Sequence, residues 1–163
     1  MRPPQEGHME KDQLIAAVTA KFPEAKVDPS PSNLAVLIVP LEQFRPLVEF
    51  LKSDSAMNFD YPMCQTAVDW PEQNKITPIL HLYSMQNDHK IAIKCDVDRA
   101  DPKMPTVSDL WPGCEWFERE TYDMYGVVFE NHPDLRRIMM TDDWVGYPLR
   151  KDYRDSRIAG KPF

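Results

Sequence analysis

Residues 79–98 read ILHLYSMQNDHKIAIKCDVD and contain the clearest secondary-structure signal in the chain. In the second half of this segment the apolar side chains occupy every other position: Ile91, Ile93, Cys95 and Val97. Such alternation is typical of a half-buried β-strand. Leu80 and Leu82 alternate in the same way, and residues 86–89, Gln-Asn-Asp-His, are turn formers. The sequence therefore predicts an antiparallel hairpin, with His89 in its turn.

Three segments around this hairpin have apolar residues at helical spacing. They cover residues 13–22, 40–52 and 111–125. Gly126 suits the left-handed backbone position that follows a helix. The third helix is expected to place one stripe of side chains against the sheet: Phe117, Thr121, Met124 and Tyr125.

Two further segments have the pattern of strands. Residues 34–39 form a short apolar run, and Thr66, Val68 and Trp70 alternate with other residues in the middle of the chain. Short links and a hairpin, instead of strict strand–helix alternation, favour an α+β fold. We therefore predict a mixed, largely antiparallel sheet flanked by helices, with an extended C-terminal arm.

Charge is unevenly distributed along the 163 residues. The formal net charge is −7, and this acidity argues against nucleic acid as a partner. Residues 130–163 contain seven basic and six acidic residues, whereas residues 1–129 contain 12 basic and 20 acidic residues. The longest apolar run, residues 34–39, is far shorter than a membrane-spanning helix requires. No secretory signal is predicted at the N-terminus.

The change in pattern after Phe129 suggests a boundary. Residues 1–129 are predicted to form the α+β domain, with 1–9 as a flexible leader, and residues 130–163 to form an extended docking arm. The arm has little periodicity, yet it contains many large apolar side chains: Leu135, Ile138, Met139, Met140, Trp144, Tyr147, Leu149 and Tyr153. A solvated tail does not need such side chains. We expect the arm to lie on another protein, held extended by a chain rich in proline (16 against five glycines).

Signals for a cofactor or metal are weak. The three cysteines, Cys64, Cys95 and Cys114, form no Cys-x-x-Cys pair, and they are expected to be small buried or half-buried thiols in a reducing compartment. His81, His89 and His132 lack the spacing of a helical zinc site. Glycine-rich phosphate loops and a G-x-S-x-G sequence are also absent from the sequence. No metal ligand or nucleotide site is therefore predicted.

Two charged groups are candidates for function. The first group is Glu118, Arg119, Glu120 and Asp123, with His132 further along the chain, and it contains the side chains of a general acid–base pair. The favoured interpretation is instead a charged helix face that bonds to Arg136 and Arg137, because ion-pair networks are commoner than catalytic dyads. The second group is residues 148–152, Pro-Leu-Arg-Lys-Asp, between Tyr147 and Tyr153. Arg and Tyr dominate interface hot spots, so this group is predicted to anchor the arm in a partner.

The segment ERETYDMYGVVFENHPDLRRI, residues 118–138, resembles the signature of the 30-kDa subunit family of respiratory complex I. The elements of that pattern are all present: Glu118, Arg119, Glu120, Asp123, Met124, Tyr125, His132, Arg136, Ile138 and Met139. Residues 111–116 and 141–153 also look like family segments. The resemblance is strong over residues 58–153, and the chain departs from longer relatives in having only ten residues after Tyr153.

The resemblance implies a scaffold. Such a subunit is non-catalytic and assembles the peripheral arm of a proton-translocating NADH:quinone oxidoreductase, on the cytoplasmic face of the inner membrane. It holds no cofactor, because FMN, the iron–sulfur clusters and quinone are bound by partner subunits. Its expected partners are the hydrogenase-large-chain-like subunit and the terminal-cluster subunit, and it meets the membrane only through the complex. The expected signature and interface residues are Glu118, Arg119, Glu120, Asp123, Gly126, His132, Pro133, Arg136, Arg137, Pro148, Arg150, Lys151 and Asp152.

Three other interpretations stay open at this point. An equivalent subunit of a membrane-bound hydrogenase or a ferredoxin-dependent complex would have the same fold. A stand-alone acid–base enzyme would use Glu118, Glu120 and His132. A generic acidic interaction module would need none of these residues in defined positions.

Overall fold

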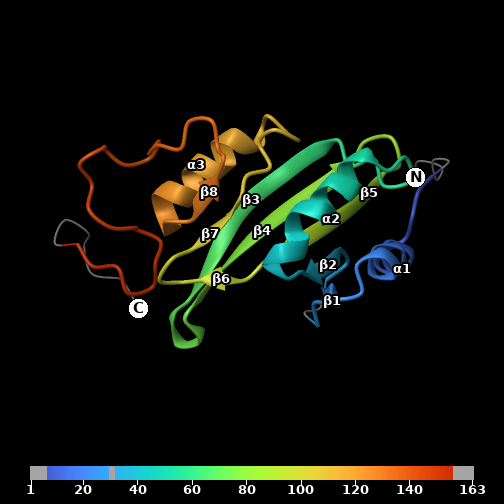
Figure 1. Ribbon diagram of the computed structural model, residues 1–163, viewed down its shortest axis with the longest axis horizontal. Coiled ribbons are helices and arrows are strands. Elements are labelled where there is room, and N and C mark those ends of the chain that lie inside the picture. Colours follow the sequence, from blue (N-terminus) through green and yellow to red (C-terminus); the bar gives the residue numbers. More distant parts are fainter. Residues whose placement is uncertain (1–6, 30–31, 156–163) are drawn as a thin grey trace.

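The computed structural model of the chain describes residues 7–29 and 32–155 (Figure 1). The helices are α1 (Lys11–Lys21), α2 (Leu41–Ser53) and α3 (Cys114–Tyr125), with a short 3₁₀ helix η1 (Pro71–Gln73). The strands are β1 (Lys26–Val27), β2 (Ala35–Ile38), β3 (Tyr61–Trp70), β4 (Lys75–Ser84), β5 (His89–Lys94), β6 (Val97–Asp98), β7 (Lys103–Pro105) and β8 (Val128–Glu130).

The main sheet has the strand order β1-β2-β5-β4-β3, and β6 pairs with β4. β2 and β5 run parallel, whereas the other pairs in this sheet are antiparallel. The predicted mixed, largely antiparallel sheet with flanking helices is therefore confirmed. A second, two-stranded sheet joins β7 and β8 in parallel beside α3 (Figure 1).

The central hairpin of β4 and β5 has the predicted partners. Leu80 pairs with Ile93 and Leu82 with Ile91, and all four side chains are buried. One detail of the prediction was wrong, because His89 is the first residue of β5 and is not in the turn. Its ring is buried and its Nε2 donates to the carbonyl of Met57 at 2.7 Å. This bond and packing on the Phe59 ring draw the histidine into the core.

The predicted first and second helices are confirmed. α1 buries Leu14 and Val18. The apolar face of α2 is buried through the side chains of Phe44, Leu47, Val48 and Leu51. All of these side chains join those of β2, β4 and β5 in one core. Figure 1 shows α2 lying over the sheet, roughly along β4 and β5.

The face that β3 turns inward differs from the one suggested by its apolar residues. Gln65, Ala67 and Asp69 are buried, whereas Thr66 and Trp70 are exposed. The register explains this result, because Gln65 pairs with Leu80 and so shares its inward face. Two polar side chains are thus brought inside the fold.

α3 begins at Cys114, three residues later than predicted, and the residues before it form turns. The indole of Trp111 is buried here and donates to the carbonyl of Phe59 at 2.9 Å. Gly126 ends the helix with φ +79°, as predicted. A Cβ at this glycine would lie 2.5 Å from the ring of Tyr147, so both the conformation and the space require glycine.

Outside these elements the structure describes part of the leader and most of the arm. His8 Nδ1 lies 2.8 Å from the carbonyl of Asp88, while residues 1–6 and 156–163 lie outside the described residues. Residues 131–155 contain neither helix nor strand and loop around α3 (Figure 1). Of the three free thiols, Cys95 and Cys114 are buried as expected, but Cys64 is exposed.

Candidate subunit interface

Asp123, near the end of α3, is the centre of the contacts that hold the arm. Its carboxylate is fully buried. One oxygen accepts the backbone N–H groups of Ile138, Met139 and Met140 at 3.0, 2.7 and 2.9 Å, and the other accepts Arg137 Nη1 at 2.5 Å. Burial alone would raise the pKa of Asp123, but the hydrogen bonds from Met140 and Arg137 outweigh it and lower this pKa. Asp123 is therefore held as a carboxylate.

Arg137 extends this contact further along the arm. Besides the carboxylate, it reaches the backbone carbonyl of Asp123 at 3.1 Å and that of Gly146 at 3.0 Å. Its guanidinium also lies over the ring of Tyr147. The predicted bond between the charged helix face and Arg137 is confirmed. Arg136 makes a different pair, with Asp134 at 2.8 Å on the surface.

A second buried carboxylate, Asp69 on β3, holds the far part of the arm. Its oxygens accept Arg99 Nε at 2.7 Å and the backbone N–H of Lys151 at 2.8 Å. Arg99 also donates to Asp152 at 2.6 Å. Burial would raise the pKa of Asp69, yet the bonds from Arg99 and Lys151 lower it. Asp69 and Arg99 were not among the predicted residues, although an aspartate inside a predicted strand is a signal for a buried partner.

Further bonds tie the arm to the end of α3. Arg150 Nε donates to the carbonyl of Tyr125 at 2.7 Å, and the N–H of Leu149 donates to the carbonyl of Met124 at 3.1 Å. Arg150 also lies over the ring of Tyr147, which in turn packs on Gly126. The predicted anchor at residues 148–152 is thus bonded to the chain's own domain.

Glu118 and His132 meet where the arm begins. Both side chains are fully buried, with 3.8 Å between His132 Nε2 and a Glu118 oxygen. Glu118 accepts the Thr106 hydroxyl and, at 2.8 Å, the N–H of Val107. His132 Nε2 donates to the carbonyl of Glu115 at 3.2 Å, and its Nδ1 accepts the N–H of Asp134 at 3.0 Å. The pair therefore joins α3, the loop after β7 and the arm.

The acid–base enzyme required Glu118, Glu120 and His132 together at an accessible site. The structure buries the side chains of Glu118 and His132 completely and leaves Glu120 exposed. A substrate in solvent cannot reach the buried pair in this conformation. The Glu118 carboxylate accepts hydrogen bonds from the Thr106 hydroxyl and the Val107 N–H, so it links α3 to the loop after β7.

Glu118 is expected to make stability depend on pH near neutrality. Burial raises its pKa to about 7, against the hydrogen bonds from Thr106 and Val107. A raised pKa stabilises the fold fully below the unfolded value of 4.5, and this contribution is lost as pH rises through about 7. In urea unfolding, the stability of Glu118→Gln relative to wild type should rise by about 3 kcal/mol from pH 4.5 to 8. The exposed Glu120→Gln is the control, and an equal profile for both variants would contradict the prediction.

The predicted interface residues divide into two groups. The side chains of Glu118, Arg119, Asp123, His132, Arg137 and Arg150, with Gly126 and Pro148, are buried or half-buried against the chain's own fold. Glu120, Pro133, Arg136, Lys151 and Asp152 are exposed, and of these Asp152 bonds to Arg99. Their contact with another subunit stays a prediction.

Large apolar side chains nevertheless point to solvent along α3 and the arm. The exposed ones are Trp116, Met139, Val145 and Leu149, with Val145 at 83%. The backbone near three of them is fixed by Asp123, Arg137 and Arg150, so their exposure is part of a defined conformation. Three of the four lie within residues 139–149, which makes this segment a candidate for a surface that another protein covers.

Comparison with known proteins decides the family. The model of "Respiratory-chain NADH dehydrogenase, 30 Kd subunit" matches residues 37–157. The chain belongs to this family. The C subunit of the NADH-quinone oxidoreductase of Moorella thermoacetica is 39% identical over 92% of this chain and 99% of its own length. The corresponding protein of Chloroherpeton thalassium is 36% identical over 90% of this chain, which spans 62% of that relative's length.

Two solved structures have the same fold. A trypsin-resistant fragment of Nqo5 superimposes with a TM-score of 0.67 at 26% identity, over 78% of this chain and all of the fragment. A chain of a membrane-bound sulfane sulfur reductase, an archaeal respiratory membrane complex, gives 0.75 at 28% identity, over 88% of this chain and 85% of its own. The fold therefore also occurs in a respiratory complex that is named for a different reaction.

The described part of the chain contains no helix that could span a membrane and no group of side chains placed to bind a metal ion. Within residues 7–29 and 32–155, no helix is long and apolar enough to cross a membrane. The same residues contain no group of three or more His, Cys, Asp or Glu side chains placed to hold a metal ion.

Proposed function

We propose that this 30-kDa-family chain braces the peripheral arm of a proton-translocating NADH:quinone oxidoreductase without catalysing a step itself. By its family the chain is a subunit of an NADH-quinone oxidoreductase, and other subunits of the complex are its partners. The proposal depends on one observation about the C-terminal arm of this chain. The arm exposes apolar side chains, while its backbone is bonded to two buried carboxylates, Asp123 and Asp69. The α+β domain supports the C-terminal arm, and the arm provides the surface that contacts other subunits.

The proposal also covers the cofactors, the partner subunits and the location of the chain. FMN, the iron–sulfur clusters and quinone would be held by partner subunits. Those partners would be the hydrogenase-large-chain-like subunit and the terminal-cluster subunit, at the cytoplasmic face of the membrane. The relatives named for NADH-quinone oxidoreductase, at 36–39% identity, favour a quinone-reducing complex over the sulfane sulfur reductase type at 28%.

The arm surface can be tested without disturbing the bonds beneath it. The double variant Val145→Asp with Leu149→Asp places charge on two exposed apolar positions. We expect at least tenfold less of the other subunits to co-purify with the tagged variant than with wild type, because burial of either aspartate would leave an unpaired charge. Recovery is measured by quantitative mass spectrometry after affinity purification from cells that make the complex.

A matched control comes from a distant part of the fold. Val27→Asp with Met85→Asp changes two exposed apolar residues on β1 and the β4–β5 turn. This control should retain wild-type recovery, and both double variants should keep the wild-type thermal midpoint within a few degrees. Equal recovery of the two double variants would show that the arm surface is not the docking surface.

A further inference from the structure

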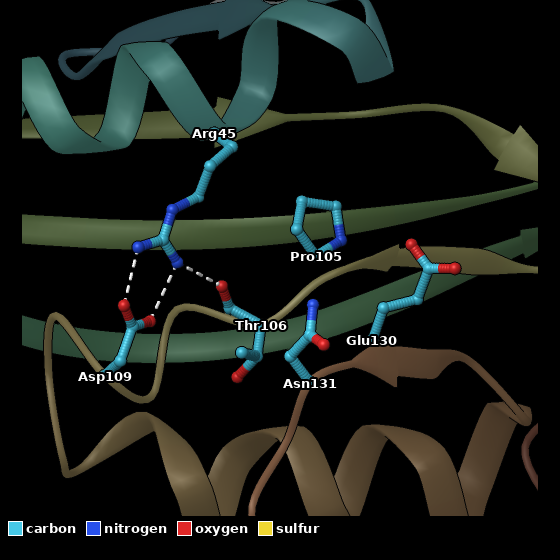
Figure 2. Close-up of a pocket in the computed structure, with 6 residues that line it drawn as sticks. All are labelled: Arg45, Pro105, Thr106, Asp109, Glu130 and Asn131. Atoms are coloured by element: carbon cyan, nitrogen blue, oxygen red, sulfur yellow. Dashed lines mark hydrogen bonds and ion pairs between the residues drawn. The ribbon is translucent and has the colours of Figure 1, made fainter.

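A pocket of about 330 Å³ lies between α2 and the start of the arm. Its lining residues are Arg45, Pro105, Thr106, Asp109, Glu130 and Asn131. Figure 2 shows Arg45 and Asp109 at one end, Glu130 at the other, and Thr106 and Asn131 between them. The pocket is open to solvent and is separate from the exposed apolar residues of the arm.

The guanidinium of Arg45 lines this pocket, and most of its N–H groups already donate hydrogen bonds within the chain. Its Nη1 donates to the Thr106 carbonyl at 2.8 Å and to Asp109 at 2.7 Å, and its Nη2 donates to Asp109 at 2.5 Å (Figure 2). Its Nε donates to Glu49 at 2.7 Å. Four of the five guanidinium N–H groups thus have partners within the described chain. A bound anion would find one free N–H and two neighbouring carboxylates.

At the other end of the pocket, Glu130 provides a carboxylate. Its carboxylate is exposed, and it makes no hydrogen bond or ion pair with the described residues. Lys103 on the adjacent strand is within electrostatic reach of Glu130, but its ammonium group is paired with Asp101 at 2.8 Å. The Glu130 oxygens are therefore free to accept hydrogen bonds from a new partner.

The balance of charge favours a cation. The lining of the pocket contains one guanidinium, on Arg45, and two carboxylates, on Asp109 and Glu130, and the guanidinium is already paired with Asp109 and with Glu49. A carboxylate that keeps its acceptor sites beside an amide is a ready partner for an ammonium or guanidinium group. Asn131 supplies that amide, held on the pocket wall by a left-handed backbone with φ +65°.

We infer that this pocket receives a lysine or arginine side chain from another subunit of the complex, with Glu130 as its ion-pair partner. The inference rests on the proposed function and names the chemistry of one contact within it. Glu130 and Asn131 open the arm that the proposal assigns to subunit contact, so a subunit lying on the arm is adjacent to the pocket. A buried, hydrogen-bonded ion pair at this position would fix the register between the two subunits.

Competition for assembly tests this contact. Wild type and one variant, carrying different tags, are produced together in cells that lack their own copy of the chain. The complex is then purified through another subunit, and the ratio of the two tags is measured. Glu130→Lys should be under-represented at least tenfold, because it puts a cation against the incoming one. Glu130→Gln should be reduced by a smaller factor, since it keeps the shape and loses the charge.

Glu72→Lys on η1 is the matched control, because Glu72 is also an exposed acid and lies outside the pocket. It should enter the complex as well as wild type does. Entry of Glu130→Lys at the level of Glu72→Lys would overturn the inference, and would leave the proposed function intact if the Val145 and Leu149 double variant is still excluded. Failure of wild type itself to enter the complex would overturn both.

Discussion

Replacing Asp123 with alanine is expected to release the arm from the domain and to lower the free energy of unfolding by about 3–5 kcal/mol. One buried carboxylate accepts three consecutive backbone N–H groups and the guanidinium of Arg137. Without it, a largely buried guanidinium and three N–H groups lose their partner at once. Urea unfolding of the full chain measures the loss.

Two comparisons make this prediction specific. Asp142→Ala removes an exposed carboxylate from the same arm and should change stability by less than about 0.5 kcal/mol. Asp123→Asn keeps an acceptor oxygen and loses the charge, so its cost should fall between the two. Trypsin should also cleave Asp123→Ala after Arg136 and Arg137 much faster than it cleaves wild type. Unchanged cleavage and stability would mean that Asp123 does not hold the arm.

The second large effect is expected at Asp69. Asp69→Ala should cost about 3–5 kcal/mol, because it leaves Arg99 and the N–H of Lys151 without their buried acceptor. Arg99→Ala should cost a similar amount, since it leaves the Asp69 carboxylate buried with one donor fewer. The double variant should cost clearly less than the two single changes added together, as coupled partners do.

Asp152→Ala is the control for this site. It removes the other ion-pair partner of Arg99, but the Asp152 side chain is 64% exposed, so the cost should stay below about 1 kcal/mol. Additive costs for Asp69→Ala and Arg99→Ala would contradict the buried pair that the structure shows.

Deletion of residues 130–163 needs a different interpretation from the one that the sequence suggested. From the sequence, this segment is an arm whose removal leaves a folded domain behind. In the structure, Asp123, Asp69 and Glu118 all have bonds to this segment or lie against it. A deletion would therefore expose or orphan three buried carboxylates. The point substitutions at Val145 and Leu149 separate docking from folding more cleanly than the deletion does.

Short-range signals correctly predicted most of the fold. The alternation of Ile91 and Ile93 predicted a strand whose apolar side chains are buried, and Gly126 marked the end of α3. The prediction was wrong for the face of β3, because Trp70 is exposed while polar Gln65 and Asp69 are buried. The donors to Asp69 come from elsewhere in the chain, and no local pattern contains them.

Prediction of the candidate site from the sequence was likewise limited to residues that are close along the chain. The Asp123–Arg137 pair could be predicted from the sequence because the two residues are close in the chain and oppositely charged. Asp69 is separated from its partners Arg99 and Lys151 by 30 and 82 residues along the chain, and only the folded sheet brings them together. The pocket at Glu130 likewise combines α2, the loop after β7 and the start of the arm.

The sequence by itself thus determined the α+β class, the hairpin, the three helices and the family signature, because each depends on spacing along the chain. The tertiary structure alone decided which charges are buried and which surface is left for a partner. Burial depends on segments that are distant in sequence, and a buried carboxylate is tolerated only where those segments supply its donors. The described part of the arm, residues 130–155, is accordingly a surface whose inner side is bonded to the domain and whose side chains Met139, Val145 and Leu149 face outward.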